Sequence, residues 1–144
     1  FTNCYIEGTT DFIFGPSTAL FEYCELHSKR DSYITAASTP KGVEFGYVFK
    51  NCRLTAAPGI KKVYLGRPWR PYAATAFINC EFGGHIRPEG WHNWKNPENE
   101  RTARYAEFGN TGDRCGYIGT RGMGQTAYKE GSLEVYTGEY FQRK

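Results

Sequence analysis

The sequence predicts an all-β fold, a parallel β-helix in which the chain winds through stacked turns. The first observation is a repeat: four segments align without gaps, each with phenylalanine at its first position and cysteine at its fourth. These segments are Phe1–Ile6, Phe21–Leu26, Phe49–Leu54 and Phe77–Phe82. The second observation is the period of a strand, because the residue two positions after each cysteine is also apolar. Repeats of 20 to 28 residues with this period are typical of a β-solenoid.

A corner is expected inside each repeat. Phenylalanine and cysteine are three positions apart, which is an odd step along a strand. If both side chains point inward, the chain must turn between them. Asn3, Asn51 and Asn79 lie at that point in three of the repeats. Asparagine tolerates left-handed backbone and hydrogen-bonds to its own main chain, so we expect it to form the corner.

The repeated cysteines are expected to be core residues. The chain has five cysteines, so at least one lacks a disulfide partner, and no pair has Cys-x-x-Cys spacing. Stacked turns put like residues above one another at about 4.8 Å. We therefore expect Cys4, Cys24, Cys52 and Cys80 to form one inward column of buried thiols, not metal ligands or disulfides. Cys115 lies outside the repeat and is expected to be a local packing residue.

A second set of strand-like segments alternates with the first. These segments are residues 11–14, 33–36 and 63–66. Residues 105–108 are expected to add one more strand, and residues 83–99, with several prolines and glycines, are expected to form a loop. From Gly116 onward we expect the chain to pack along the outside of the solenoid or to be irregular. No linker or change of composition divides the chain, so we expect one domain.

Composition argues against several classes of function. The net charge is +3, from 18 basic and 15 acidic residues, without the dense basic run typical of nucleic-acid binding. No apolar run approaches the length of a membrane span. The chain opens on Phe1 within a strand-like pattern, without the pattern of a signal peptide. We therefore expect the sequence to begin partway through a larger protein.

Residues that could carry chemistry are few. The three aspartates, at positions 11, 31 and 113, are too scattered in sequence to suggest the oxygen cluster of a calcium-dependent lyase or the carboxylate pair of a glycosidase. No Gly-x-Ser-x-Gly elbow is present. The histidines at positions 27, 85 and 92 lack the spacing of metal ligands.

Asp11 is the strongest candidate for a reacting group, because it lies in a strand-like run where aspartate is disfavoured. Arg67 lies in the corresponding segment two repeats later, so we expect the two side chains to meet on one face, in an open groove. Trp69 lies among prolines and arginine and offers a flat surface for a sugar ring. The alternatives are a turn aspartate, a structural ion pair and a core tryptophan.

Two stretches resemble the signature motifs of the pectin methylesterase (pectinesterase) family. They are Gly-Thr-Thr-Asp-Phe-Ile-Phe-Gly at residues 8–15 and Leu-Gly-Arg-Pro-Trp at residues 65–69. Residues 33–39 resemble the strand and loop between these motifs in their bacterial form, and residues 88–91 and 107–112 resemble downstream segments. The resemblance covers roughly residues 1–115 and implies a right-handed parallel β-helix, in agreement with the repeats.

The resemblance implies a role for each matching residue. Asp11 matches the nucleophilic aspartate, and Arg67 matches the arginine that hydrogen-bonds to it and orients it. Trp69 matches the aromatic platform under a galacturonate ring. Phe14 and Trp91 match aromatic residues that line the cleft.

Part of the family's machinery has no match in this chain. The general-acid aspartate and the glutamines that stabilise the oxyanion belong to motifs that precede the first stretch, and neither Asp31 nor Asp113 fits them. We therefore expect residues 1–144 to be the C-terminal part of a single β-helix domain, truncated on its N-terminal side. We also expect this segment, taken alone, to be inactive and poorly soluble, because a solenoid cut mid-stack exposes its core and a strand edge.

The implied reaction is hydrolysis of the C6 methyl esters of galacturonate units, which gives methanol and pectate. The implied partner is methyl-esterified pectin (homogalacturonan), with no metal, organic cofactor, nucleic acid or membrane partner. The resemblance further implies a monomer that is secreted or periplasmic. Two alternatives stay open. A non-catalytic polysaccharide-binding β-helix would not need the Asp11–Arg67 pair, and a β-helix lyase or glycosidase would show further acidic residues.

Overall fold

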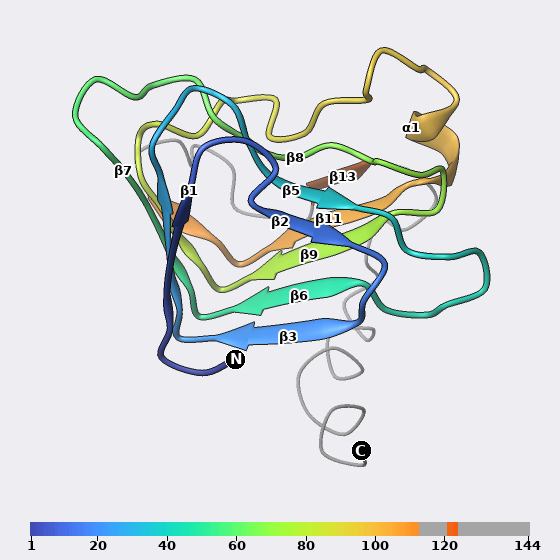
Figure 1. The fold of residues 1–144 in the computed structure, drawn as a ribbon, viewed down its shortest axis with the longest axis horizontal. Coiled ribbons are helices and arrows are strands. Elements are labelled where there is room, and N and C mark those ends of the chain that lie inside the picture. Colours follow the sequence, from blue (N-terminus) through green and yellow to red (C-terminus); the bar gives the residue numbers. More distant parts are fainter. Residues whose placement is uncertain (113–120, 124–144) are drawn as a thin grey trace.

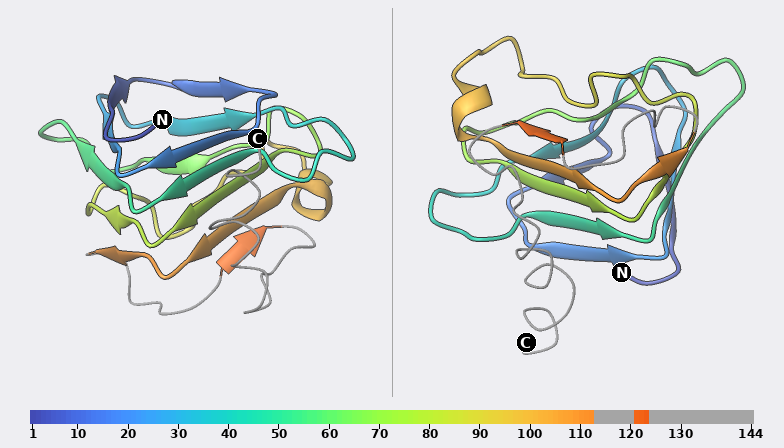
Figure 2. Two further views of the ribbon diagram at one scale, coloured as in Figure 1. Left: turned by 90° about the horizontal axis from the view of Figure 1, so that it is seen from below. Right: turned by 180° about the vertical axis from the view of Figure 1, so that it is seen from behind.

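The computed structural model describes residues 1–112 and the main chain of residues 121–123, which form three sheets (Figure 1). The strand orders are β1-β4-β7-β10-β12, β13-β11-β9-β6-β3 and β2-β5-β8. The strands are β1 (Tyr5–Gly8), β2 (Ile13–Gly15), β3 (Ala19–Glu22), β4 (Glu25–Ser28), β5 (Tyr33–Ala37), β6 (Tyr47–Lys50), β7 (Arg53–Ala56), β8 (Tyr64–Gly66), β9 (Ala74–Ile78), β10 (Glu81–Phe82), β11 (Arg104–Phe108), β12 (Thr111–Gly112) and β13 (Arg121–Met123). Figure 2 shows the strands of successive turns stacked above one another.

Successive turns stack in parallel. In the second sheet, Phe49 of β6 lies between Phe21 of β3 and Phe77 of β9. In the first sheet, Leu26 of β4 pairs with Leu54 of β7. Among the described residues the strand pairs are parallel, except that β13 runs antiparallel to β11 at the edge of the second sheet. The predicted parallel β-helix is confirmed, and the antiparallel edge strand lies beyond the part of the chain where the repeats apply.

The corner between phenylalanine and cysteine is confirmed. The rings stack in the order Phe1, Phe21, Phe49 and Phe77, with centroids 4.9, 4.6 and 4.5 Å apart. Asn3, Asn51 and Asn79 follow with φ angles of 55°, 54° and 51°, in the left-handed region. Tyr23 occupies the same corner position in the repeat Phe21–Leu26, with a φ of 54°. The left-handed residue turns the chain from one sheet to the next, so both flanking side chains point inward.

The inward column of cysteines is confirmed for Cys24, Cys52 and Cys80, which are at most 2% exposed. Cys4 is half-buried, because it lies in the first turn at the end of the stack. These four cysteines are free thiols. A buried thiol donates to a carbonyl of the preceding turn, as Cys52 Sγ does to Phe21 O at 3.3 Å. The predictions for Cys115 and for the tail from position 116 concern residues outside the described part of the chain, apart from β13.

The third sheet corresponds to the second set of strand-like segments, with one correction. Strands β5 and β8 fall where the sequence predicts them, but β2 begins at Ile13. The prediction that Asp11 lies in a strand was wrong. Asp11 has a φ of 48°, and this left-handed backbone cannot continue a strand. Aspartate tolerates it better than most residues do, because its short polar side chain can bond locally.

Residues 83–99 form the predicted loop between β10 and β11. Two isolated parallel bridges, Val63 with Ile86 and Gly66 with Trp91, hold this loop beside β8 (Figure 1). A short helix, α1 (Asn99–Thr102), ends the loop and was not predicted. No helix within residues 1–112 or 121–123 is long and apolar enough to cross a membrane.

Candidate functional site

Strand β5 fixes the main chain on both sides of the candidate site. The Asp11 amide donates to the Tyr33 carbonyl at 2.8 Å, and the Arg67 amide donates to the Thr35 carbonyl at 3.1 Å. Both acceptors belong to β5, the central strand of the third sheet. The sheet therefore brings together two residues that are 56 positions apart in the chain.

Asp11 and Arg67 form a two-point ion pair. Arg67 Nε donates to Asp11 Oδ1 at 3.1 Å, and Arg67 Nη2 donates to Asp11 Oδ2 at 2.6 Å. The planar guanidinium matches a carboxylate in this geometry and fixes its orientation. The side chains of Arg67 and Asp11 are 22% and 20% exposed. The pairing predicted from the sequence is confirmed, and the carboxylate stays partly accessible.

Each member of the pair is followed in the sequence by an exposed aromatic residue, Phe14 after Asp11 and Trp69 after Arg67. Phe14 of β2 is 64% exposed, and Trp69 is 40% exposed. Their rings meet edge to face, with centroids 6.0 Å apart. Arg70 Cζ lies over the Trp69 ring, 5.1 Å from its centroid. Trp69 is therefore a surface residue, which removes the alternative that it fills the core.

Trp91 is mostly buried and is not among the exposed aromatic residues, and its expected place along a cleft stays a prediction. It is 6% exposed and belongs to the main core cluster. Its ring stacks on Tyr105 at 4.3 Å, and its Nε1 donates to Glu107 Oε2 at 3.2 Å. The bridge to Gly66 draws this residue inward. Trp91 therefore supports the site from within the solenoid.

Two rings that sequence reasoning missed hold the guanidinium of Arg67. Arg67 Cζ lies 4.0 Å from the centroid of the Tyr33 ring and 3.9 Å from that of the Trp94 ring. Tyr33 in turn stacks on Tyr64 at 5.1 Å. The structure pairs Tyr33 with Tyr64 in neighbouring strands, but they are at the first and second positions of their predicted segments, so the sequence carries only a weak signal for Tyr33. Trp94 had none, because no repeat predicts the path of its loop.

His92 packs against both tyrosines. Its ring meets those of Tyr33 and Tyr64 edge-on, at 5.6 and 5.3 Å. Burial, and then the positive charges of Arg67, Lys95 and Arg87, lower the pKa of His92. The imidazole is therefore neutral at neutral pH.

Gly66 lets the third sheet and the loop approach each other. A Cβ at this position would overlap Thr35 Oγ1 and lie 3.2 Å from Trp91 Cζ3. Thr35 is fully buried, and its hydroxyl donates to the Leu65 carbonyl at 3.0 Å, so it has little freedom to move. The glycine that precedes Arg67 is therefore required by close packing.

A family model described as Pectinesterase matches residues 1–140. This chain belongs to the pectinesterase family. Pectinesterase 31 of Arabidopsis thaliana is 47% identical over 107 residues, which are 74% of this chain and 34% of that protein. The pectin methylesterase of Yersinia enterocolitica superposes with a TM-score of 0.77 and 27% identity over 95% of this chain and 51% of that one. A pectin methylesterase solved in complex with a hexasaccharide gives a TM-score of 0.75 and 29% identity over 95% of this chain and 48% of that one.

This pectinesterase chain therefore spans about a third to a half of the length of these relatives. Asp31, the other described aspartate, has partners of its own. Its Oδ1 accepts the main-chain amides of Lys61 and Lys62, each at 2.7 Å. These bonds lower its pKa and give it a structural role in the loop before β8. Asp113 lies outside the described residues.

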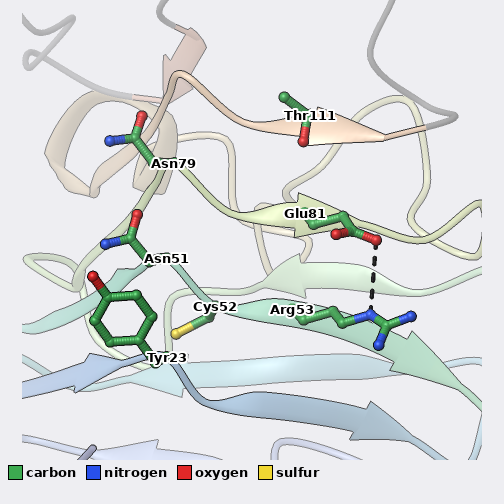
Figure 3. Close-up of a pocket in the computed structure, with 7 residues that line it drawn as sticks. All are labelled: Tyr23, Asn51, Cys52, Arg53, Asn79, Glu81 and Thr111. Atoms are coloured by element: carbon green, nitrogen blue, oxygen red, sulfur yellow. Dashed lines mark ion pairs between the residues drawn. The ribbon is translucent and has the colours of Figure 1, made fainter. Parts of the chain in front are cut away.

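A separate polar hollow of about 370 Å³ lies at the corners between the first two sheets of the pectinesterase chain (Figure 3). It is lined by Tyr23, Asn51, Cys52, Arg53, Asn79, Glu81 and Thr111. Arg53 and Glu81 form an exposed ion pair there at 3.7 Å, and neither Asp11 nor Arg67 contributes to the lining.

Within the described residues, no group of three or more His, Cys, Asp and Glu side chains could hold a metal ion.

Proposed function

We propose that this pectinesterase chain carries the nucleophile of an enzyme that hydrolyses the C6 methyl esters of galacturonate units in pectin. The observation that carries the proposal is the ion pair of Asp11 and Arg67, with both carboxylate oxygens engaged and a fifth of the side chain exposed. An ionised carboxylate held in one orientation is suited to nucleophilic attack on an ester. Family membership supports an ester as the substrate.

In the proposed reaction, an Asp11 carboxylate oxygen attacks the ester carbonyl carbon, and the bond to the methoxy oxygen breaks. The products are an acyl anhydride on Asp11 and methanol, whose oxygen takes a proton from a general acid. Water then cleaves the anhydride, which restores Asp11 and leaves the galacturonate carboxylate. The general acid and the oxyanion donors would come from outside the described residues, because Asp31 is engaged at the loop before β8. The scheme uses no metal or organic cofactor.

Trp69 and Phe14 are proposed to hold the sugar rings. Exposed aromatic faces stack well on the apolar face of a pyranose, and these two rings meet each other and lie within three residues of Asp11 and Arg67 in the sequence. One structural relative, a pectin methylesterase, was solved with a hexasaccharide, which supports an oligosaccharide-binding surface in the family. The proposal extends to methyl-esterified pectin as partner, a monomeric state and a secreted or periplasmic location.

Product analysis on the full-length protein tests this function against its alternatives. We expect methanol to be released from methylated pectin while the polymer length stays constant. Chain cleavage, with either unsaturated products or new hydrolytic ends, would identify a lyase or a glycosidase instead. Binding of pectin without methanol release would leave the protein as a polysaccharide-binding β-helix. Either result would overturn the proposed function.

A further inference from the structure

We infer that Trp94 and His92 are positioning residues for the Asp11–Arg67 pair. Trp94 clamps the Arg67 guanidinium against Tyr33, and His92 holds the loop that carries Trp94. The inference rests on the proposed function, because it explains how the nucleophile is kept in its reactive orientation.

The clamp acts on the plane of the guanidinium. Tyr33 and Trp94 each lie about 4 Å from Arg67 Cζ, at 4.0 and 3.9 Å. An arginine side chain has many rotamers, and two ring faces leave its planar head few orientations. In the observed one, Nε and Nη2 both point at the carboxylate of Asp11. Tyr33 also accepts the Asp11 amide through its carbonyl, so one residue of β5 positions both members of the pair.

The loop that supplies Trp94 has an unusual backbone. Trp94 and Lys95 have φ angles of 60° and 56°, and two successive left-handed residues that are not glycine are strained. Local hydrogen bonds hold this turn. The Trp94 amide donates to His92 Nδ1 at 3.0 Å, and the Lys95 amide donates to Asn93 Oδ1 at 2.9 Å. Strained backbone of this kind persists where the surroundings over-determine it, and it is often found beside functional sites.

His92 can hold this turn only while Nδ1 is unprotonated. A protonated Nδ1 is a donor and cannot accept the Trp94 amide. The charged groups that face the ring are Arg67, Lys95 and Arg87, and the rings of Tyr33 and Tyr64 pack against it. All three charges are positive, so they favour the neutral form. Below the pKa of His92, which lies below its ordinary value, the acceptor is lost and the Trp94 clamp loosens.

The test measures kcat and KM for methanol release by the full-length protein and its Trp94→Ala, Trp94→Phe and His92→Asn variants. We expect Trp94→Ala to lower kcat by about 3- to 30-fold with little change in KM, and Trp94→Phe to restore most of the loss, because it keeps a ring over Arg67. The asparagine Oδ1 of His92→Asn can replace Nδ1 as acceptor but does not titrate. This variant should therefore keep activity near neutral pH and lose its activity at a lower pH than the wild type.

Tyr5→Ala is the matched control. Tyr5 is an aromatic residue of β1 that is 57% exposed and does not contact the ion pair, so its removal should leave kcat and KM unchanged. A Trp94→Ala variant with wild-type kcat would overturn the inference. A rise in KM alone would show that Trp94 binds substrate instead. If Trp94→Ala fails to fold, the kcat of Trp94→Phe and the pH profile of His92→Asn test the inference instead. If the activities of the wild type and of His92→Asn fall at the same acidic pH, the role of His92 is refuted.

Asp11→Asn, measured in parallel, separates this inference from the proposed function. If Asp11→Asn is inactive and Trp94→Ala is unimpaired, the clamp is refuted and the nucleophile stands. If Asp11→Asn keeps its activity, the proposed nucleophile is refuted whatever the Trp94 variants show.

Discussion

The carboxylate of Asp11 owes its orientation to one backbone conformation and one side chain. The left-handed φ of 48° turns this residue out of the strand that follows, and Arg67 engages both of its oxygens. The sequence predicted the pairing, because the two residues lie in corresponding segments of a repeat. It could not predict the left-handed backbone of Asp11. The residues around position 11 fit a strand as well as a turn, so they do not decide between the two.

His85 gives a prediction for stability at the residue scale. It is 6% exposed in the loop after β10, and burial, with a smaller effect from His27, lowers its pKa to about 4. The unfolded chain, with a histidine pKa of about 6.5, then binds more protons than the folded protein between pH 4 and 6.5. The contribution of His85 to stability is therefore fully present above pH 6.5 and is lost as the pH falls to 4. The free energy of unfolding falls by at most roughly 3 kcal/mol over this range.

Thermal melts of the full-length protein and its His85→Gln variant, taken from pH 7 to pH 4, check this prediction. As the pH falls, we expect the melting temperature of the wild type to decrease more than that of the variant. Parallel curves for the two proteins would mean that His85 is not the titrating group.

At the scale of elements, the repeat made most of the solenoid predictable. Phenylalanine, asparagine and cysteine recur at fixed positions, so the inward columns and the left-handed corner could be predicted without coordinates. The loop between β10 and β11 lies outside the repeat, and its course depends on contacts with distant residues such as Gly66. For this reason the sequence did not predict the burial of Trp91 or the contact of Trp94 with Arg67.

Gly66→Ala tests the contact between β8 and this loop. The added methyl group would overlap the Thr35 hydroxyl and press on Trp91. Overpacking of this kind costs about 1–3 kcal/mol, and a shift of the adjacent Arg67 should also lower kcat. Denaturant unfolding and methanol release by the full-length protein measure the two effects. Thr35→Ala removes the closest atom, so the double variant should recover part of the lost stability, and no recovery would contradict this account of Gly66.

At the scale of the whole molecule, the β-helix is a rigid scaffold that places side chains from different turns on one surface. Asp11 lies just before β2 and Arg67 just after β8, in the turns on either side of β5, and the stacked core includes Trp91 and Phe77. The central claim is that this scaffold presents Asp11 as a nucleophile. Its support is the geometry of the pair and membership of the pectinesterase family.

Methanol release by the Asp11→Asn variant of the full-length protein tests that claim most directly. Asparagine is nearly isosteric with aspartate, adopts the same left-handed backbone and keeps one acceptor for Arg67, so the melting temperature should change by less than about 5 °C. The amide cannot attack the ester, so we expect the rate to fall below about one thousandth of the wild-type rate. A folded Asp11→Asn protein that keeps more than about one hundredth of the wild-type rate would contradict covalent catalysis by Asp11.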